Sequence, residues 1–222
     1  MEFQKHTSVE MVKLFQDKPY QGQDPRKAKI IFLSSDANYS PRISEHDFFN
    51  YILEYQKDGV GFWKKYNVHH PFLLPDYPFN KTQAGVPFHR KFSKLKLSSD
   101  YSDKISFLEL LDVPTIGNKS ENRKLFWELV SEKHLRFIDS IIQNDKEKLI
   151  LAPGAVLEDM VKMKELYNVF NWLDYSSKSA ATYSQRVNNS TIRKIYHFSS
   201  SHIHGQIAEI RDQIDKFLNN NA

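Results

Sequence analysis

The chain has 222 residues, a formal net charge of +4, a hydrophobic fraction of 40% and a charged fraction of 26%. These values predict one globular domain over residues 1–222, long enough to bury a core. The chain contains no cysteine, which excludes disulfides, thiolate metal sites, cysteine nucleophiles and cysteine-bound iron–sulfur clusters. Its histidines lack the spacing of a metal site, so we expect neither a metal nor a cofactor.

No segment approaches the roughly 20 consecutive apolar residues of a membrane-spanning helix. The first residues also lack the apolar core of a signal peptide. We therefore expect a cytoplasmic monomer that has no membrane partner.

The hydrophobic pattern predicts helices and strands in alternation. The first half of the chain is expected to form a helix from Glu2 to Phe15, a strand from Ala28 to Leu33, a helix from Ser44 to Gln56 and an aromatic loop from Asp58 to Lys81. The second half is expected to continue with a strand from Ile105 to Leu111 and helices from Glu121 to Val130 and from Glu132 to Asn144. These are followed by a strand from Lys148 to Leu151, a helix from Ala155 to Leu166, a strand from Arg193 to Phe198 and a helix from His202 to Leu218. This alternation favours a three-layer α/β/α sandwich around a largely parallel four-stranded sheet.

Two of the predicted strands stop abruptly at small polar residues that carry one titratable side chain. Asp36 follows the first strand, and His197 stands at the end of the last one. Ligands of parallel α/β sheets bind beyond the carboxyl ends of the strands, so we expect both side chains in one crevice. A carboxylate and an imidazole there could activate water and stabilise charge. The alternative is that Asp36 caps a turn and His197 is a core histidine.

A short segment in the middle of the chain combines basic and aromatic residues. Arg90 and Lys91 lie between Phe88 and Phe92, and further lysines follow. This pattern predicts either contacts with a polyanion or a solvated helix face above buried phenylalanines.

Three short segments occur in the order in which one enzyme family carries its motifs, namely Ser34-Ser35-Asp36-Ala37-Asn38, Leu110-Leu111-Asp112-Val113-Pro114-Thr115 and His197-Phe198-Ser199. A fourth segment, Gln83-Ala84-Gly85-Val86-Pro87-Phe88, is similar to another segment of that family. With these segments the chain resembles the uracil-DNA glycosylase superfamily, nearest to the branches without an iron–sulfur cluster. It departs from the family at Ser34, Ala37 and Phe198, where the motifs carry glycine, proline and proline.

The resemblance implies a monofunctional DNA glycosylase that acts in base-excision repair. Such an enzyme hydrolyses the N-glycosidic bond of a damaged or deaminated, uracil-like base that has flipped out of DNA. Asp36 would hold water beneath the sugar, and a neutral His197 would donate a hydrogen bond to the departing base anion.

The resemblance also implies roles in binding the base and the DNA. Phe88 would stack on the base, but the long insertion between Asp36 and Phe88 leaves four other aromatic residues as candidates, namely Tyr39, Phe48, Phe62 and Trp63. Glu109 or Asp112 would read the edge of the base. The DNA backbone would be bound by Ser199, Ser200, Ser201, Arg90 and Lys91, with His202 or Ile203 as a wedge.

Two other classes of function remain open. A serine hydrolase could use Ser34 or Ser35 with His197 and Asp36, although the chain has no Gly-x-Ser-x-Gly elbow. A catalytically inactive nucleic-acid-binding protein of the same fold would bind DNA and release no base.

Overall fold

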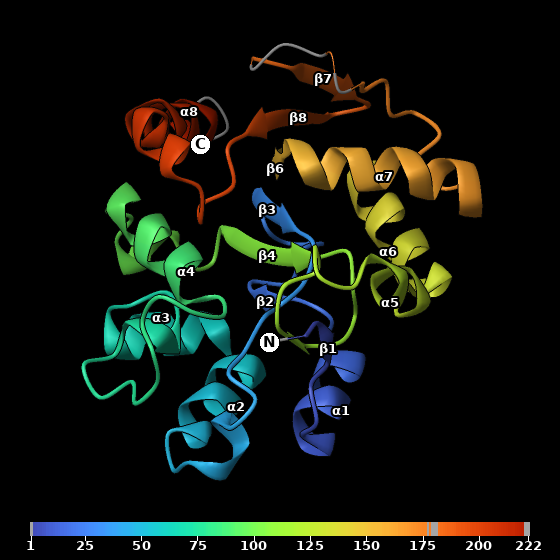
Figure 1. Cartoon of the computed structure of the whole chain (residues 1–222). Helices are drawn as coiled ribbons and strands as arrows, with labels where there is room; N and C mark the ends of the chain where they lie inside the picture. The colour runs from blue at the N-terminus through green and yellow to red at the C-terminus, as the bar shows by residue number, and fades with distance from the viewer. Residues whose placement is uncertain (1, 177, 179–181, 220–222) are drawn as a thin grey trace.

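The computed structural model describes residues 2–176, 178 and 182–219 (Figure 1). Its strands are β1 (Gln4–Lys5), β2 (Gln21–Gly22), β3 (Ile30–Ser34), β4 (Ile105–Glu109), β5 (Thr115–Ile116), β6 (Lys148–Pro153), β7 (Ser184–Val187) and β8 (Ser190–Ile195). Among these residues, β1 pairs with β5, and the other six strands form one sheet in the order β2-β4-β3-β6-β8-β7. The four inner strands are parallel, whereas β2 and β7 run antiparallel to their neighbours at the two edges.

The inner strands are buried on both faces. In β3, Ile30 and Phe32 pack on one face, and Ile31 and Leu33 pack on the other. The predicted α/β class and parallel core are therefore confirmed, while the predicted number of four strands is wrong. The predicted strand from Arg193 to Phe198 ends earlier than expected, at Ile195.

One face of the sheet is covered by three helices that follow β5 and β6 in the chain. They are α5 (Arg123–Glu128), α6 (Glu132–Ile142) and α7 (Gly154–Tyr167). Leu135 of α6 and Met160 of α7 are fully buried against Ile31 and Leu33. Asn122 and Ser131 cap the first two helices, which explains why their predicted positions agree closely with the structure.

The opposite face is covered by α4 (Val86–Phe92) and α8 (Ile207–Asn219), with the short turns η3 (Ser93–Leu95) and η4 (Ser99–Tyr101) nearby. Phe92, Phe198 and Ile210 pack against Phe32 on this side. Figure 1 shows the sheet between the two groups of helices, α4 and α8 on one side and α5 to α7 on the other. The predicted three-layer sandwich is present.

A third cluster of buried side chains lies beside the sheet and is rich in aromatic rings. It is formed by α1 (Val9–Asp17), α2 (Phe49–Lys57), α3 (Gly59–Tyr66) and the turn η2 (Pro71–Leu73). The prediction of a loop from Asp58 to Lys81 is therefore wrong. The Asp58 carboxylate accepts the N–H of Gly61 at 2.9 Å and caps α3, and Phe62 and Tyr77 pack into the cluster.

Several predicted helix starts are also early, each for a local reason. The first helix begins at Val9, because the Ser8 hydroxyl accepts the N–H of Met11 at 3.3 Å. The segment around Ser44 forms the turn η1 (Ile43–Glu45) before α2 begins at Phe49. Near the carboxyl terminus, the turn η5 (Ser201–Gly205) precedes α8.

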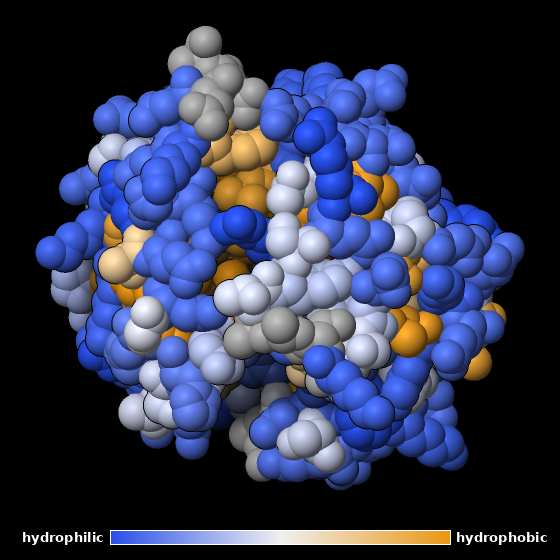
Figure 2. Space-filling view, turned by 90° about the horizontal axis from the view of Figure 1, so that it is seen from above, coloured by the Kyte–Doolittle hydropathy of each residue, from blue (hydrophilic) through white to orange (hydrophobic). Residues whose placement is uncertain are grey.

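Over the described ranges, no helix has both the length and the apolar character needed to cross a bilayer. The face in Figure 2 is largely hydrophilic, and hydrophobic side chains appear there in separate small areas. Among the residues that the structure describes, the exposed large hydrophobic side chains are Val9, Leu166 and Tyr196.

Candidate functional site

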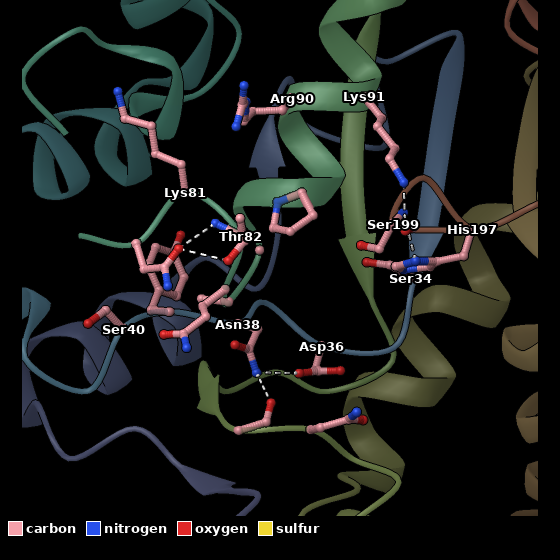
Figure 3. Close-up of a pocket in the computed structure, with 18 of the residues that line it drawn as sticks. Ser34, Asp36, Asn38, Ser40, Lys81, Thr82, Arg90, Lys91, His197 and Ser199 are labelled. Carbon is pink, nitrogen blue, oxygen red and sulfur yellow. Dashed lines mark hydrogen bonds between the residues drawn. The ribbon is translucent and has the colours of Figure 1, made fainter. Parts of the chain in front are cut away.

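A cleft of about 1380 Å³ opens beyond the carboxyl ends of the inner strands. Its walls come from residues 34–41 after β3, residues 77–94 around the start of α4, residues 117–121 after β5, the start of α7 and the loop after β8. Asp36 and His197 both line it (Figure 3). The expectation that these two side chains share one crevice is therefore met.

The loop that carries Asp36 is fixed through its backbone. The Leu110 N–H donates to the Ser34 carbonyl at 2.9 Å, and the Thr115 N–H donates to the Ala37 carbonyl at 2.9 Å. The Tyr39 N–H in turn donates to the Thr115 carbonyl at 2.9 Å. These bonds join the loop to the segment that contains β5, so Asp36 is held in one position.

The two oxygens of the Asp36 carboxylate have different surroundings. Oδ2 accepts the Thr115 hydroxyl and the Asn38 side-chain N–H, the latter at 3.5 Å. No hydrogen bond from another described residue reaches Oδ1. Burial raises the pKa of Asp36, and Thr115, Lys119 and Asn38 act against that rise. Oδ2 is thus anchored, Oδ1 has no hydrogen-bond partner among the described residues, and Asp36 lines the cleft.

His197 faces the cleft as a neutral donor. The Ser199 backbone N–H donates to its Nδ1 at 3.1 Å, so the neutral ring carries its hydrogen on Nε2. The ring is open to the cleft but is enclosed by its walls, and this desolvation, together with the positive charges of Lys119 and Lys91, lowers the pKa of His197 to about 4. Its side chain is exposed to the cleft, which rules out the alternative of a core histidine.

A smaller cavity of about 40 Å³ lies behind Asp36. It shares Ser34, Asp36, Asn38, Tyr39 and Gly85 with the wall of the cleft. Three of the predicted base-binding residues line this inner cavity, namely Phe88, Tyr39 and Glu109. The Phe88 ring also lies 5.6 Å from the His197 ring, centroid to centroid. An aromatic face and polar groups thus adjoin both candidate catalytic residues.

The polar groups of the inner cavity are strongly desolvated. Glu109 is 5% exposed, and burial and the nearby Asp36 raise its pKa to about 8. At neutral pH its carboxyl group is therefore mainly protonated and can both donate and accept hydrogen bonds. The Tyr39 hydroxyl accepts the Gln21 side-chain N–H at 2.6 Å, which leaves the hydroxyl hydrogen of Tyr39 for another partner.

Three buried histidines pack beside the inner cavity. His69 Nε2 and His89 Nδ1 share a hydrogen bond of 3.1 Å, and the rings of His70 and His89 stack at 3.6 Å. Burial holds the pKa of each ring below its usual value. In the part of the chain that the structure describes, no group of three histidine or carboxylate side chains is placed to hold a metal ion.

The rim of the cleft is cationic. Lys81, Arg90, Lys94 and Lys119 line it, and Lys81 and Arg90 extend away from Asp36 (Figure 3). Lys91 differs from these, because its ammonium donates to the carbonyls of Ser199 and Ser200 at 2.8 and 3.1 Å. The side chain that was expected to bind phosphate therefore holds the loop that carries His197.

Some of the predicted site residues lie elsewhere. Asp112, Ser200, Ser201 and His202 line neither the cleft nor the inner cavity. The Ser200 hydroxyl instead caps η5 by accepting the His202 N–H at 3.3 Å. The alternative stacking residues Phe48, Phe62 and Trp63 are buried in the cores.

Lys119 and His204 also line the cleft, although neither was predicted as a site residue. Lys119 lies in a polar loop without periodicity, where a single lysine carries no signal. The serine hydrolase alternative finds no support, because the Ser34 hydroxyl donates to Glu109 at 3.4 Å and the Ser35 hydroxyl accepts from Lys119.

Comparison with protein-family models, with curated proteins and with solved structures finds no match to this chain.

Proposed function

We propose that this chain is a monofunctional DNA glycosylase that removes a deaminated or damaged, uracil-like base in base-excision repair. The observation that carries the proposal is the pair of groups in one cleft, an Asp36 oxygen that accepts no hydrogen bond from another described residue and a neutral His197 donor. The resemblance of four short segments to the uracil-DNA glycosylase superfamily points to the same activity. The enzyme would act as a cytoplasmic monomer.

The two groups suit the two charges that develop when an N-glycosidic bond breaks. As the bond from C1′ to the base nitrogen lengthens, the sugar becomes cationic and the base becomes anionic. Asp36 stabilises the sugar cation, orients water for attack on C1′ and accepts the proton that the water loses. His197 donates from Nε2 to an oxygen of the departing base, which then takes a proton from solvent.

The inner cavity is suited to reading the edge of a base. Phe88 offers a ring for stacking, and the Glu109 carboxyl and the Tyr39 hydroxyl offer hydrogen bonds. The volume of about 40 Å³ has room for a few ordered waters, so the edge of the base would displace them. An extruded base is commonly recognised by stacking and by hydrogen bonds to its edge.

The cationic rim is suited to the phosphates that flank the extruded nucleotide. Lys81, Arg90 and Lys94 lie around the cleft and can contact the backbone without reading sequence. DNA is therefore the proposed partner, bound through charge at the rim and through the base in the interior.

The test is a panel of oligonucleotides that each carry one lesion, namely uracil, hypoxanthine, xanthine or an alkylated base. The formation of abasic sites is scored. We expect the wild-type protein to release at least one of these bases, and Asp36→Asn to lose most of that activity while DNA affinity stays within a few fold. Asp112→Asn is the matched control, because Asp112 lies outside both cavities.

Two results would reject parts of this assignment. Full activity of Asp36→Asn would remove Asp36 from the mechanism. DNA binding without release of any base would favour the catalytically inactive nucleic-acid-binding protein instead.

A further inference from the structure

Lys119 joins two parts of the wall of the cleft. Its ammonium donates to the Ser35 hydroxyl and to Asp159 Oδ2, the latter at 2.9 Å. Ser35 is 7% exposed and directly precedes Asp36, and Asp159 lies on α7. Lys119 therefore fastens the loop of the proposed catalytic carboxylate to a helix on one face of the sheet.

The charge of Lys119 is not required to neutralise Asp159. Arg123 already donates to both oxygens of that carboxylate, at 2.6 and 3.3 Å. Asp159 is 4% exposed, and a buried carboxylate that keeps such a partner is not left unpaired. A second cation on the same carboxylate leaves a net positive charge that faces the cleft.

That positive charge acts on both proposed catalytic residues. The attraction of Lys119 favours the ionised form of Asp36, and its repulsion favours the neutral form of His197. These are the two forms that the proposed mechanism uses. The effect should grow when a bound base excludes water from the cleft, because charges interact more strongly in a less polar medium.

We propose that Lys119 is a positioning residue for Asp36, because its ammonium ties the Ser35–Asp36 loop to α7 and places a positive charge beside the carboxylate. Its importance for catalysis rests on the proposed glycosylase function, whereas the tie itself does not depend on it. The other groups that face Asp36 are Thr115, Asn38, Asp159 and Glu109. Thr115 and Asn38 also favour the ionised carboxylate, and Asp159 opposes it. The nearby charge of Asp36 instead raises the pKa of Glu109, which is the group that stays protonated.

The experiment compares Lys119→Met with Arg123→Met in the full chain. Arg123 shares Asp159 with Lys119 but does not touch Ser35 and does not line the cleft, which makes Arg123→Met the matched control. The titration of the Asp36 carboxyl is followed by ¹³C NMR, with Asp36→Asn to assign its signal. The pH dependence of base release is measured on the same proteins.

We expect Lys119→Met to raise the pKa of Asp36 by about one unit, which is the size of effect typical of one nearby opposite charge. The acidic limb of kcat/KM should move to higher pH by the same amount. Lys119→Arg should bring the pKa of Asp36 and the acidic limb of kcat/KM most of the way back to their wild-type values, because arginine keeps the positive charge. Arg123→Met should raise the pKa of Asp36 by clearly less than Lys119→Met does, because Arg123 binds Asp159 and makes no hydrogen bond to the Ser35–Asp36 loop.

An unchanged Asp36 titration in Lys119→Met would overturn the proposal. A fall in DNA affinity and in its salt dependence, without a pKa shift, would instead make Lys119 a phosphate contact. If the wild-type protein releases no base, the glycosylase function fails, but the NMR titration still decides the role of Lys119. Should Lys119→Met not fold, Ser35→Ala removes the acceptor and keeps the ion pair, and a smaller shift in the same direction is expected.

Discussion

His197 owes its hydrogen-bonding state to the main chain. The Ser199 N–H fixes Nδ1 as an acceptor, and the low pKa of the ring keeps it neutral at physiological pH. His197→Ala should therefore lower turnover by about 10²–10³-fold, the usual loss for one donor to a developing anion. The Tm should change little, because the ring is exposed to the cleft.

The matched control for that variant is His46→Ala. His46 also accepts a backbone N–H two residues further along, that of Phe48 at 3.0 Å, and it does not line the cleft. Its removal should leave turnover unchanged. A fall in Tm of several degrees with near-normal turnover in His197→Ala would show that the histidine is structural.

Glu109 makes the stability of the fold depend on pH. Its pKa rises from 4.5 to about 8 on folding, so the folded protein keeps a proton that the unfolded chain releases between these values. The loss of folding stability caused by Glu109 is absent below pH 4.5, grows between pH 4.5 and pH 8, and is complete above pH 8. Glu109→Gln should therefore be the more stable protein at pH 9, by at most about 5 kcal/mol.

Denaturant unfolding of both proteins at pH 5, 7 and 9 measures this difference. Glu128→Gln is the control, because Glu128 lies on the exposed surface of α5 with only a 3.7 Å contact to Lys124. A difference that stays constant over this pH range would mean that Glu109 is ionised throughout.

Helix α4 presents two neighbouring cations with different tasks. Arg90 is exposed on the rim, while Lys91 binds the carbonyls of Ser199 and Ser200. Arg90→Ala should weaken binding to all DNA sequences equally. It should also reduce the salt slope, which is the steepness of the plot of the logarithm of the binding constant against the logarithm of the salt concentration, by about one. Lys91→Ala should act mainly on turnover, because it releases the loop that orients His197.

Binding titrations over a range of salt concentrations separate the two effects. Lys124→Ala is the control, because Lys124 is highly exposed on α5 and does not line the cleft. Equal losses of salt slope in Arg90→Ala and Lys91→Ala would place both side chains on phosphate.

The sequence predicts elements whose pattern is set by burial. The inner strands are continuous apolar runs, so their existence follows from composition alone. The edge strands β2 and β7 are short and carry polar residues such as Gln21 and Ser184, and their pairing depends on neighbours that are distant in the sequence. Helix α3 begins at Gly59 and contains Gly61, which mask its helical character.

The same distinction holds for the candidate site. Asp36 and His197 stand directly after or at the end of predicted strands, and topology alone brings such positions together. The role of Lys91 and the position of Lys119 depend on contacts between loops, which no local pattern encodes. Ser200 and Asp112 were placed by motif alone, and their side chains lie outside the cleft.

At the scale of the whole molecule, α3 links the aromatic cluster to the sheet. Phe62 packs into the cluster and Trp63 into the core under α4, while a Cβ at Gly59 would lie 2.7 Å from the Gly22 nitrogen. Gly59→Ala should therefore destabilise the protein by about 1–3 kcal/mol. It should do so in one cooperative transition.

Chemical denaturation, monitored both by fluorescence and by circular dichroism, tests whether Gly59→Ala is less stable and whether it unfolds in a single transition. Gly205→Ala is the control, because a Cβ there meets no atom within 4 Å. Two separate transitions would show that residues 37–86 unfold independently of the sheet.

The strand order also has a consequence for the nascent chain on the ribosome. Asp36 follows the first inner strand to be synthesised, whereas His197 and β8 come near the end. Until β8 emerges, one edge of β6 has no partner, because β8 pairs along the whole of it. An unpaired apolar edge readily recruits other chains. The unfinished polypeptide therefore lacks His197 in its cleft and is prone to association, and both conditions end when β8 and the loop that follows it have been synthesised.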